Sequence, residues 1–320
     1  MIRGMTDFRV ESEQIDLPSG AFCKSRRDYV RWRGRTILGL SANAFRAYLF
    51  PVCTPAGLPL TEESPIDHPH HQSVWIGADH VDCLLPYAGG QFEVANYNFY
   101  VQEVFQGRAP GRMIVRAMDW VALAERHLRV VQDIEWRGPA EWGAAKGRAI
   151  ARESRAIDIQ AGDLAHVIDV RSRLRSGACD LQIGPTRHAY FGIRLVEPLR
   201  PDGNATLVDA QGRSEVAAID GTDSDWIHVA GQITRDHQAG MACFPHPPAG
   251  AFTWGVHPWG TFDLNPLRRE SCVLTAGKYA EYGMRLVVHD GACRATEIAA
   301  LHREFCETRL DDWNDLPESL

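Results

Sequence analysis

The sequence predicts a mainly β protein: a large antiparallel β-sandwich with a short helix near its C-terminus. Short segments rich in β-branched and aromatic residues recur along the 320-residue chain. Turn-forming pairs such as Pro110-Gly111 and Asp290-Gly291 separate many of them. Clear helical periodicity occurs in only one segment. Short strands with frequent turns are typical of antiparallel sandwiches and barrels.

The expected strands follow one another from the N-terminus. Each is a short run of β-prone residues bounded by residues that favour turns. They are expected at residues 8–10, 29–32, 98–101, 113–116, 128–131, 166–170, 190–195 and 285–288. Residues 119–126 fit either a short helix or a strand, and residues 139–150 fit a loop or a hairpin tip.

Residues 295–307, ATEIAALHREFCE, form the clearest predicted helix. Thr296 is expected to cap its N-terminus, and Ile298, Leu301 and Phe305 make an apolar stripe. No internal repeat or low-complexity linker divides the chain, so residues 1–310 are expected to form a single β-sandwich domain. Residues 311–320 are acidic and are expected to be a flexible tail.

Composition narrows the function. The net charge is −7 and no long basic run is present, which disfavours a nucleic-acid partner. No apolar stretch approaches the roughly 18 residues needed to cross a bilayer, so no membrane partner is expected. The N-terminal residues lack the apolar centre of a signal peptide, and we therefore expect a cytoplasmic protein.

The eight cysteines contain no CxxC pair. In a chain without an export signal they are expected to be reduced and mostly buried. A zinc cluster built from thiols is not expected, because ligand pairs with the usual close spacing are missing.

The segment Asp67-His68-Pro69-His70-His71, called here the histidine turn, is the most informative motif. The proline restricts the backbone, so the imidazoles should fan out from a rigid turn. Such a cluster suits a proton-transfer, polyol-binding or metal site. The alternative is a structural turn whose imidazoles bond to the backbone and to core tyrosines.

A second group combines His246, which lies between two prolines, with Trp254 and Trp259. The two indoles could form an aromatic wall against a sugar, with nearby polar groups bonding its hydroxyls. The alternative is that both tryptophans are core residues. His80, which follows the histidine turn, is a weaker candidate.

Two further segments carry charged side chains at strand positions. If residues 152–159 form a strand, Glu153 and Arg155 share one face, and Arg155 would keep the carboxylate ionised. A paired and solvated strand face is the alternative. In residues 184–194 a polar turn leads into a strand, and four side chains there could reach a cleft: Arg187, His188, Tyr190 and Arg194. For Arg194 a structural pair with a carboxylate is the alternative.

Known nucleotide and hydrolase motifs are missing. The sequence has no P-loop, no G-x-G-x-x-G after a strand, no H-E-x-x-H and no G-x-S-x-G. No nucleotide cofactor is therefore expected.

The motifs also stand in an order that resembles a known family. They are Ala47–Gly57, Asp67–Gly77, Glu153-Ser154-Arg155, Gly184-Pro185-Thr186, Phe244–Pro247 and Trp259–Pro266. Over about residues 40–290 the chain resembles the bacterial family catalogued as PmoA-like, which is of unknown function and often labelled methane oxygenase. Its members look like β-sandwich proteins that accompany sugar catabolism. The family usually has arginine where this chain has Gln72, and often an acidic residue near His188.

The residues and the resemblance together predict a carbohydrate-active enzyme with a fold similar to the galactose mutarotase class. It would move protons on a sugar or keto-sugar, as an epimerase, lyase or hydrolase. His71 or His246 is expected as the acid and Glu153 as the base. The residues expected to hold the carbohydrate are Asp67, His68, His70, Arg194 and Trp259. The histidine turn and His246 should then share one cleft.

Two alternatives remain open. One is a metal-dependent enzyme, including the oxygenase that the family label names, with His68, His70 or His71 and His246 binding a divalent metal. The other is a sugar-binding protein without catalysis. No cofactor is predicted for the carbohydrate enzyme, and its partner is a small-molecule carbohydrate.

Overall fold

The computed structural model describes residues 6–14, 26–141, 143–246 and 252–307. Three β-sheets hold nearly all of the regular structure in these ranges. The predicted tail at 311–320 lies outside the described residues. Within the described part of the chain, no helix is both long enough and apolar enough to span a membrane.

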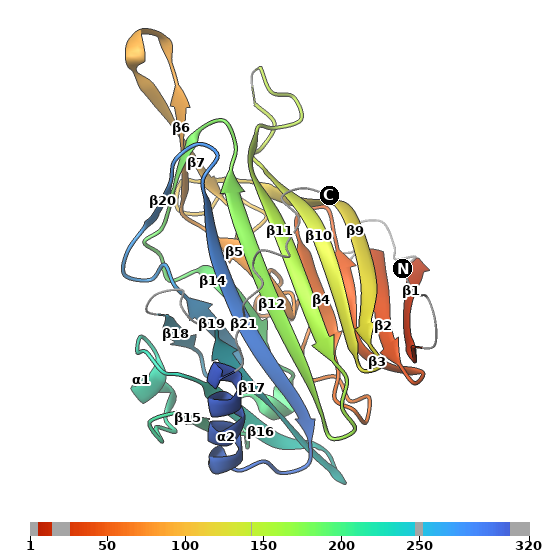
Figure 1. Ribbon diagram of the computed structural model, residues 1–320. Helices are drawn as coiled ribbons and strands as arrows, with labels where there is room; N and C mark the ends of the chain where they lie inside the picture. The colour runs from red at the N-terminus through yellow and green to blue at the C-terminus, as the bar shows by residue number, and fades with distance from the viewer. Residues whose placement is uncertain (1–5, 15–25, 142, 247–251, 308–320) are drawn as a thin grey trace.

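The first sheet has eight strands, and all neighbours in it are antiparallel. It forms the layer behind the long strands in Figure 1. In spatial order its strands are β1 (Phe8–Gln14), β2 (Arg26–Trp32), β3 (Arg35–Ala42), β4 (Ala47–Val52), β5 (Val74–Ala78), β14 (Ala189–Arg194), β19 (Thr261–Asn265) and β18 (Thr253–Val256).

The second sheet also has eight antiparallel strands. Its longest strands cross the front of the molecule in Figure 1. In spatial order they are β15 (Thr206–Asp209), β16 (Ile227–Thr234), β17 (His237–Pro245), β21 (Tyr279–Asp290), β12 (Ala165–Ser176), β11 (Ala149–Gln160), β10 (His127–Arg137) and β9 (Arg112–Ala124).

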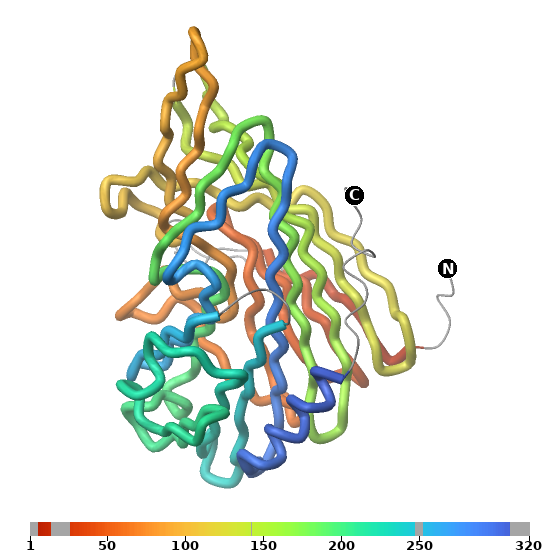
Figure 2. The backbone as a smooth tube through the Cα atoms, turned by 60° about the vertical axis from the view of Figure 1, so that its left-hand side comes forward, coloured from red at the N-terminus to blue at the C-terminus, as the bar shows by residue number. Residues whose placement is uncertain are grey.

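A smaller five-stranded sheet lies at one end. Its strands are β20 (Cys272–Leu274), β13 (Asp180–Ile183), β6 (Val81–Pro86), β7 (Phe92–Asn98) and β8 (Ala109–Pro110). The hairpin of β6 and β7, with η1 (Ala88–Gly90) in its turn, projects beyond the two layers (Figures 1 and 2). Two other short helices are η2 (Glu197–Leu199) and α1 (Val216–Ile219).

The hydrophobic core lies between the two large sheets. Val74 and Ile76 of β5 belong to the same buried cluster as Ile168 of β12 and Leu286 of β21. Side chains alternate between the faces of a strand, so Trp75 points to the outer face of the first sheet. The prediction of a mainly antiparallel β-sandwich is confirmed, and the candidate site is built on that outer face.

The predicted C-terminal helix is confirmed as α2 (Ala295–Glu307), which packs on the outer face of the second sheet (Figure 1). Ile298 and Phe305 are buried there with Phe244 of β17. Two details of the prediction are wrong. The helix begins at Ala295, so Thr296 lies inside it and is not the capping residue. At this end the backbone N–H of Arg294 donates a hydrogen bond to Glu297 Oε2 at 2.7 Å. Leu301 is 36% exposed, because only one narrow stripe of so short a helix faces the sheet.

Three other segments can be compared with their predictions. Only Asn98 of the predicted strand at 98–101 belongs to a strand, as the last residue of β7. Residues 99–101 turn away, because Asn98 Oδ1 accepts hydrogen bonds from the N–H groups of Tyr100 and Val101. Residues 119–124 belong to strand β9. Of the predicted loop or hairpin tip at 139–150, most of residues 139–148 connect β10 to β11 without strand structure, whereas Ala149 and Ile150 already belong to β11.

Candidate active site

The candidate site starts from one row of outward-facing residues on the first sheet. Trp75 of β5 pairs with Gly192 of β14, which pairs with Asp263 of β19, which pairs with Gly255 of β18. A Cβ at Gly192 would lie 2.2 Å from the Trp75 ring, and one at Gly255 would lie 3.1 Å from Asp263 Oδ2. The glycines therefore make room for the indole and the carboxyl.

Replacing Gly192 by Ala is expected to lower the free energy of unfolding by about 1–3 kcal/mol, because the added methyl overlaps the Trp75 ring. Urea unfolding followed by tryptophan fluorescence measures the effect. Gly203→Ala is the matched control, since its Cβ would meet nothing closer than 3.4 Å. Equal unfolding midpoints for the two variants would contradict the close approach of Trp75 to Gly192.

The histidine turn precedes β5 and packs through a column of parallel rings. His68 stacks between Trp259 and His71, with ring centroids 5.3 and 4.7 Å away. His71 also stacks on Trp75 at 5.0 Å. His257 stacks on Trp259 at 4.6 Å. The column joins two loops that are far apart in sequence.

Both ring nitrogens of His71 are bonded within the protein. Nε2 lies 2.8 Å from the Tyr100 hydroxyl, and Nδ1 lies 3.1 Å from Thr261 Oγ1. Burial lowers the pKa of His71 far below its usual range, and the charges of its neighbours add to the effect. Burial, followed by the charge of Arg46, lowers the pKa of His70 to about 3. These imidazoles are therefore neutral at physiological pH.

Asp67 is held by two partners. Arg194, which is fully buried, donates from Nη2 to both carboxylate oxygens at 2.8 Å. His68 Nδ1 lies 2.9 Å from Asp67 Oδ2. Burial alone would raise the pKa of Asp67, but the hydrogen bonds from His68 and Arg194 lower it to about 2. Asp67 is thus an ionised side chain of fixed orientation at the edge of the site.

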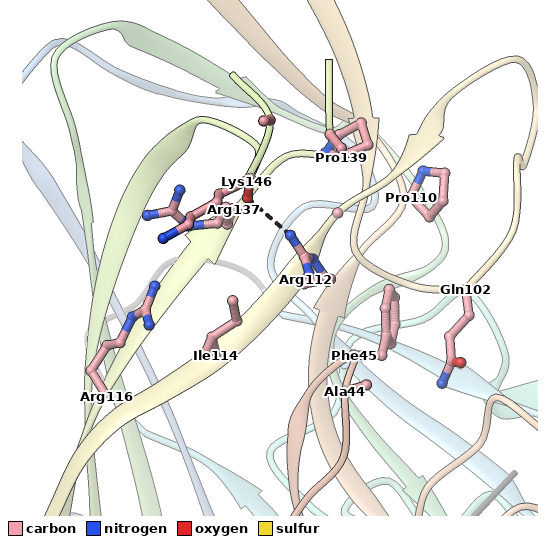
Figure 3. Close-up of a pocket in the computed structure, with 13 residues that line it drawn as sticks. Ala44, Phe45, Gln102, Pro110, Arg112, Ile114, Arg116, Arg137, Pro139 and Lys146 are labelled. Carbon is pink, nitrogen blue, oxygen red and sulfur yellow. Dashed lines mark hydrogen bonds between the residues drawn. The ribbon is translucent and has the colours of Figure 1, made fainter. Parts of the chain in front are cut away.

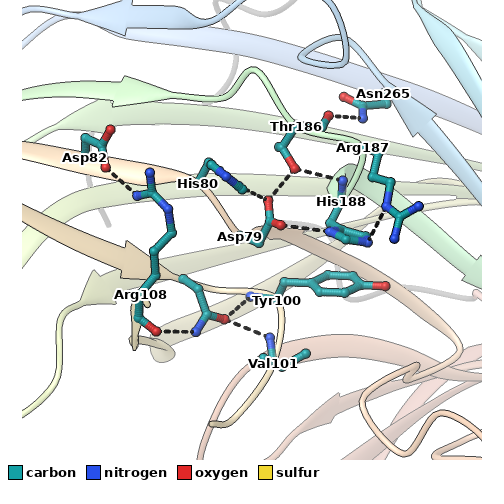
Figure 4. A network of polar contacts seen from close by, with 11 residues as sticks. Asp79, His80, Asp82, Tyr100, Val101, Arg108, Thr186, Arg187, His188 and Asn265 are labelled. Atoms are coloured by element: carbon teal, nitrogen blue, oxygen red, sulfur yellow. Dashed lines mark hydrogen bonds and ion pairs between the residues drawn. The ribbon is translucent and has the colours of Figure 1, made fainter. Parts of the chain in front are cut away.

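A second carboxylate network lies nearby (Figure 4). Asp79, whose side chain is fully buried, is bonded by Thr186 Oγ1, by His188 Nδ1 at 2.7 Å and by His80 Nδ1 at 2.8 Å. Burial would raise the pKa of Asp79, but these bonds lower it. Arg187 Nε donates to His188 Nε2 at 3.1 Å, so His188 carries its proton on Nδ1. The network holds Arg187 and His188 beside Tyr100, whose ring stacks on His188 at 4.7 Å.

Asp263 differs from the other two carboxyl groups. Within the described ranges no side chain or backbone group donates a hydrogen bond to it, and His257 Nε2 lies 3.9 Å from Oδ2. Burial raises the pKa of Asp263 to about 8, although the charge of Arg268 acts against this. Burial also lowers the pKa of His257. At neutral pH this pair is a protonated carboxyl group beside a neutral imidazole.

The His257 side of the pair borders open space. A cavity of about 500 Å³ is lined by His257, Asp220, Pro258, Pro201 and other residues. Cavities that bind small organic ligands usually measure about 300–1,000 Å³. The Asp263 side chain itself is 7% exposed. A ligand could therefore approach the pair from the His257 side.

The structure brings together most of the residues predicted from sequence. The histidine turn, Arg194 and Trp259 all lie in one cluster. Trp254 is not part of it. That indole is fully buried and donates to the Ser224 carbonyl at 2.8 Å, as expected of a core residue.

Glu153 lies elsewhere, between the two sheets. Its carboxylate accepts from Arg155 Nε at 2.7 Å, from Ser172 Oγ at 2.9 Å and from Trp136 Nε1 at 3.0 Å, and the residue has no exposed surface. The predicted pairing with Arg155 on one strand face is found, but that face is in the core rather than in solvent. Glu153 does not reach the histidine turn.

His246 lies on a third surface, the outer face of the second sheet. Its Nε2 is 2.8 Å from Asp169 Oδ1, and Arg285 binds the same carboxylate through two hydrogen bonds of 2.8 Å. Phe305 of α2 contacts its ring, with centroids 5.1 Å apart. The expectation that His246 shares a cleft with the histidine turn is wrong, because the two large sheets separate them.

The predicted metal ligands do not converge either. In the ranges that the structure describes, no group of three or more His, Cys, Asp and Glu side chains is arranged to hold a metal ion. His68, His70 and His71 pack ring against ring instead, and both nitrogens of His71 are bonded to other residues. The side chains present therefore do not fit the proposed metal site.

Sequence reasoning missed Asp263, His257, Tyr100 and Asp79 as site residues, whereas His188 was among the side chains expected to reach a cleft. A signal for Asp263 was available. In Thr261–Asn265 polar and apolar residues alternate, which places three polar side chains on one strand face. Alternation alone does not show that these polar side chains are buried, because loops cover the outer face of the first sheet.

The buried neutral histidines predict sensitivity to acid. Burial lowers the pKa of His166 and of His228 to about 4, in addition to the lowered values of His70 and His71. The unfolded chain takes up these protons below about pH 6.5 while the folded state does not, so stability is lost as pH falls through this value. We expect the urea midpoint to drop clearly between pH 7 and pH 5. His228→Gln should reduce the drop, whereas exposed His237→Gln should not. An unchanged midpoint would contradict the burial of the neutral rings.

Comparison with known proteins gives distant structural matches to carbohydrate-active enzymes. A GH36 α-galactosidase from Geobacillus stearothermophilus is 10% identical, with a TM-score of 0.43, over 87% of this chain and 41% of the enzyme. A galactose mutarotase related enzyme from Lactobacillus acidophilus is 9% identical, with a TM-score of 0.27, over 88% and 97% of the two chains. A 4-α-glucanotransferase from Thermococcus litoralis is 10% identical, with a TM-score of 0.27, over 90% and 40%.

The chain thus spans about two fifths of the length of the galactosidase and the glucanotransferase. No protein with a curated description matches the sequence. One protein-family model does match, over residues 36–303.

Proposed function

The chain belongs to the family that this model describes, a family of unknown function (DUF6807), and we propose that it is a carbohydrate-active enzyme that works by proton transfer at Asp263 and His257. The Asp263–His257 pair carries the proposal. Burial raises the pKa of the carboxyl to about 8 and lowers the pKa of the imidazole. Titratable groups whose environments push their pKa values apart are the arrangement expected of an acid and a base.

The reaction class follows from these protonation states. Protonated Asp263 gives its proton to a sugar oxygen while neutral His257 accepts a proton from the substrate or, in hydrolysis, from the attacking water. The proton balance of the pair is restored by the reverse transfer or by exchange with water, so an epimerase, a lyase or a hydrolase fits. His71, whose two nitrogens are bonded inside the protein, positions the loops. His246 and Glu153 have structural roles.

A carbohydrate suits the surroundings of the pair. Sugars need donors and acceptors of fixed orientation together with flat apolar surfaces. Asp67 and His68 are each about one third exposed, at 37% and 33% of the side chain. Trp259 is partly exposed beside them, but its indole N–H is buried and has no hydrogen-bond partner among the described residues. The accessible Asp67 carboxylate and His68 ring therefore support recognition of hydroxyl groups.

We further infer that this family is the PmoA-like group that the motifs resemble, and that the oxygenase label does not describe this chain. The oxygenase hypothesis requires a metal site built from the histidine turn and His246. Those residues lie on different sheets, and the rings of the turn pack against one another. The donor geometry therefore supports the carbohydrate hypothesis over the metal hypothesis.

The test is a panel of aldoses, ketoses and uronates incubated with the protein in deuterated water and followed by NMR. An enzyme of this class speeds anomer exchange, introduces deuterium at a C–H position or releases a new product. Binding without any of these changes, measured by calorimetry on the same panel, would identify a sugar-binding protein instead. Neither binding nor turnover on the whole panel would contradict a carbohydrate function.

A further inference from the structure

A second cavity shares no lining residue with the Asp263 site (Figure 3). Its volume is about 820 Å³, within the range of cavities that bind small organic ligands. Phe45, just before β4, forms one wall. β9, the end of β10 and the connection from β10 to β11 form the others.

The lining of this cavity is positively charged. Four cationic side chains line it, and no Asp or Glu does: Arg112, Arg116, Arg137 and Lys146. Just outside, Glu135 binds two of them, Arg116 and Arg137. The four cations of the lining therefore have one carboxylate among their bonded partners in the described ranges.

Two of the cations remain uncompensated. Arg112 donates from Nη2 to the Lys146 carbonyl at 2.9 Å, and in the part of the chain that the structure describes it has no carboxylate partner. The same holds for the ammonium group of Lys146, which is exposed. In Figure 3 the Arg112 side chain lies between Lys146 and Phe45. An anion in the cavity would neutralise charges that the protein leaves open.

The rest of the lining is apolar. Phe45, Pro110, Ile114 and Pro139 supply carbon surface beside the cations. Phe45 is 4% exposed and forms a buried wall, so the accessible carbon surface comes from the partly exposed Pro110, Ile114 and Pro139. A purely inorganic anion would leave the surface of these three residues uncovered.

We propose that this cavity binds a small organic anion, with its carboxylate or phosphate group against Arg112 and Lys146 and its carbon skeleton against Pro110, Ile114 and Pro139. The planar guanidinium matches both anionic groups, which it can bind through two parallel hydrogen bonds. The site is independent of the proposed proton-transfer function, because its lining contains none of the residues assigned to that reaction.

The experiment is titration calorimetry on the full chain at low salt, with glucuronate, glucose 6-phosphate, glucose and inorganic phosphate as probes. We expect both organic anions to bind, glucose not to bind at this cavity, and phosphate to bind more weakly than glucose 6-phosphate. Whichever organic anion binds better identifies the preferred group. Affinity should fall as salt is raised, because the contacts are ionic.

Variants locate the binding. Arg112→Gln and Lys146→Gln should each weaken organic-anion binding about 10–100-fold, the loss expected for a hydrogen bond to a charged group. Exposed Lys278→Gln and the active-site variant Asp263→Asn should bind like the wild type. Anion binding unchanged in both cavity variants, or lost only in Asp263→Asn, would overturn the proposal. The proposal would also be overturned if glucose bound to the wild type and Arg112→Gln and Lys146→Gln weakened that binding as much as they weaken anion binding. Thermal midpoints of Arg112→Gln and Lys146→Gln show whether each variant is folded.

Discussion

Replacing Asp263 by Asn should lower kcat/KM for the sugar substrate by about 10²–10⁴-fold, the usual contribution of a positioned acid. The amide keeps the shape of the side chain but has no acidic proton. In the wild-type protein activity should fall above pH 8, because the pKa of Asp263 is raised to about 8 and the acid form is then lost. Rates from pH 5 to pH 10, measured on the substrate found by NMR, test both expectations.

The pH dependence of unfolding stability distinguishes a catalytic role of Asp263 from a role in packing alone. The unfolded chain releases the Asp263 proton near pH 4, whereas the folded protein keeps it until about pH 8. Stability is therefore lost as pH rises from about 4 to about 8. Asp263→Asn should therefore be more stable than the wild type at pH 9, by a few kcal/mol as an order of magnitude. Exposed Asp236→Asn is the control and should change neither property. An Asp263→Asn variant with full activity would refute the assignment.

Replacing Glu153 by Ala should have the largest effect on stability. The change leaves Arg155 buried without its carboxylate and removes the acceptor of Trp136 and Ser172. Breaking a buried ion pair by removing one partner costs about 3–5 kcal/mol. Urea unfolding at pH 7 measures the loss. A catalytic base would give the opposite result, a stable but inactive protein.

The double variant Glu153→Met with Arg155→Met is the matched control. Both charges are then absent, and apolar side chains of similar length fill the space, so much of the stability should return. Exposed Glu125→Ala, which breaks a surface ion pair with Arg33 at 3.6 Å, should hardly change the midpoint. If the double variant is no more stable than Glu153→Ala, the damage comes from the lost volume and not from the unpaired charge.

Much of the fold could be predicted because local patterns determine it. A run of β-prone residues located the strand around Arg285–Val288, and the periodicity of residues 295–307 matched the helix at both ends. The prediction of a strand failed beyond Asn98, because the Asn98 side chain accepts hydrogen bonds from two backbone N–H groups that could otherwise pair in a sheet. The β propensity of the residues does not include this competition.

The site was only partly predictable for a different reason. The histidine turn and its neighbours Arg194 and Trp259 are recognisable by residue type, and they lie together. Glu153 and His246 carry the same kinds of side chain, but Glu153 is held in an ion pair in the core and His246 contacts Asp169 on the outer face of the second sheet. Which layer of a sandwich a strand face belongs to depends on the order of the strands, and the local sequence does not contain that order.

Strand order also bears on how quickly the protein folds. His188 bonds Asp79 across 109 residues of chain, and His71 contacts Thr261 across 190. Long loops must close before either contact forms, and proteins rich in such pairings fold slowly, over roughly milliseconds to seconds. The contacts around Asp263 should therefore be among the last to form. A newly made chain would acquire its ligand-binding ability only when folding is complete, so a ligand would stabilise the finished protein without guiding the earlier steps.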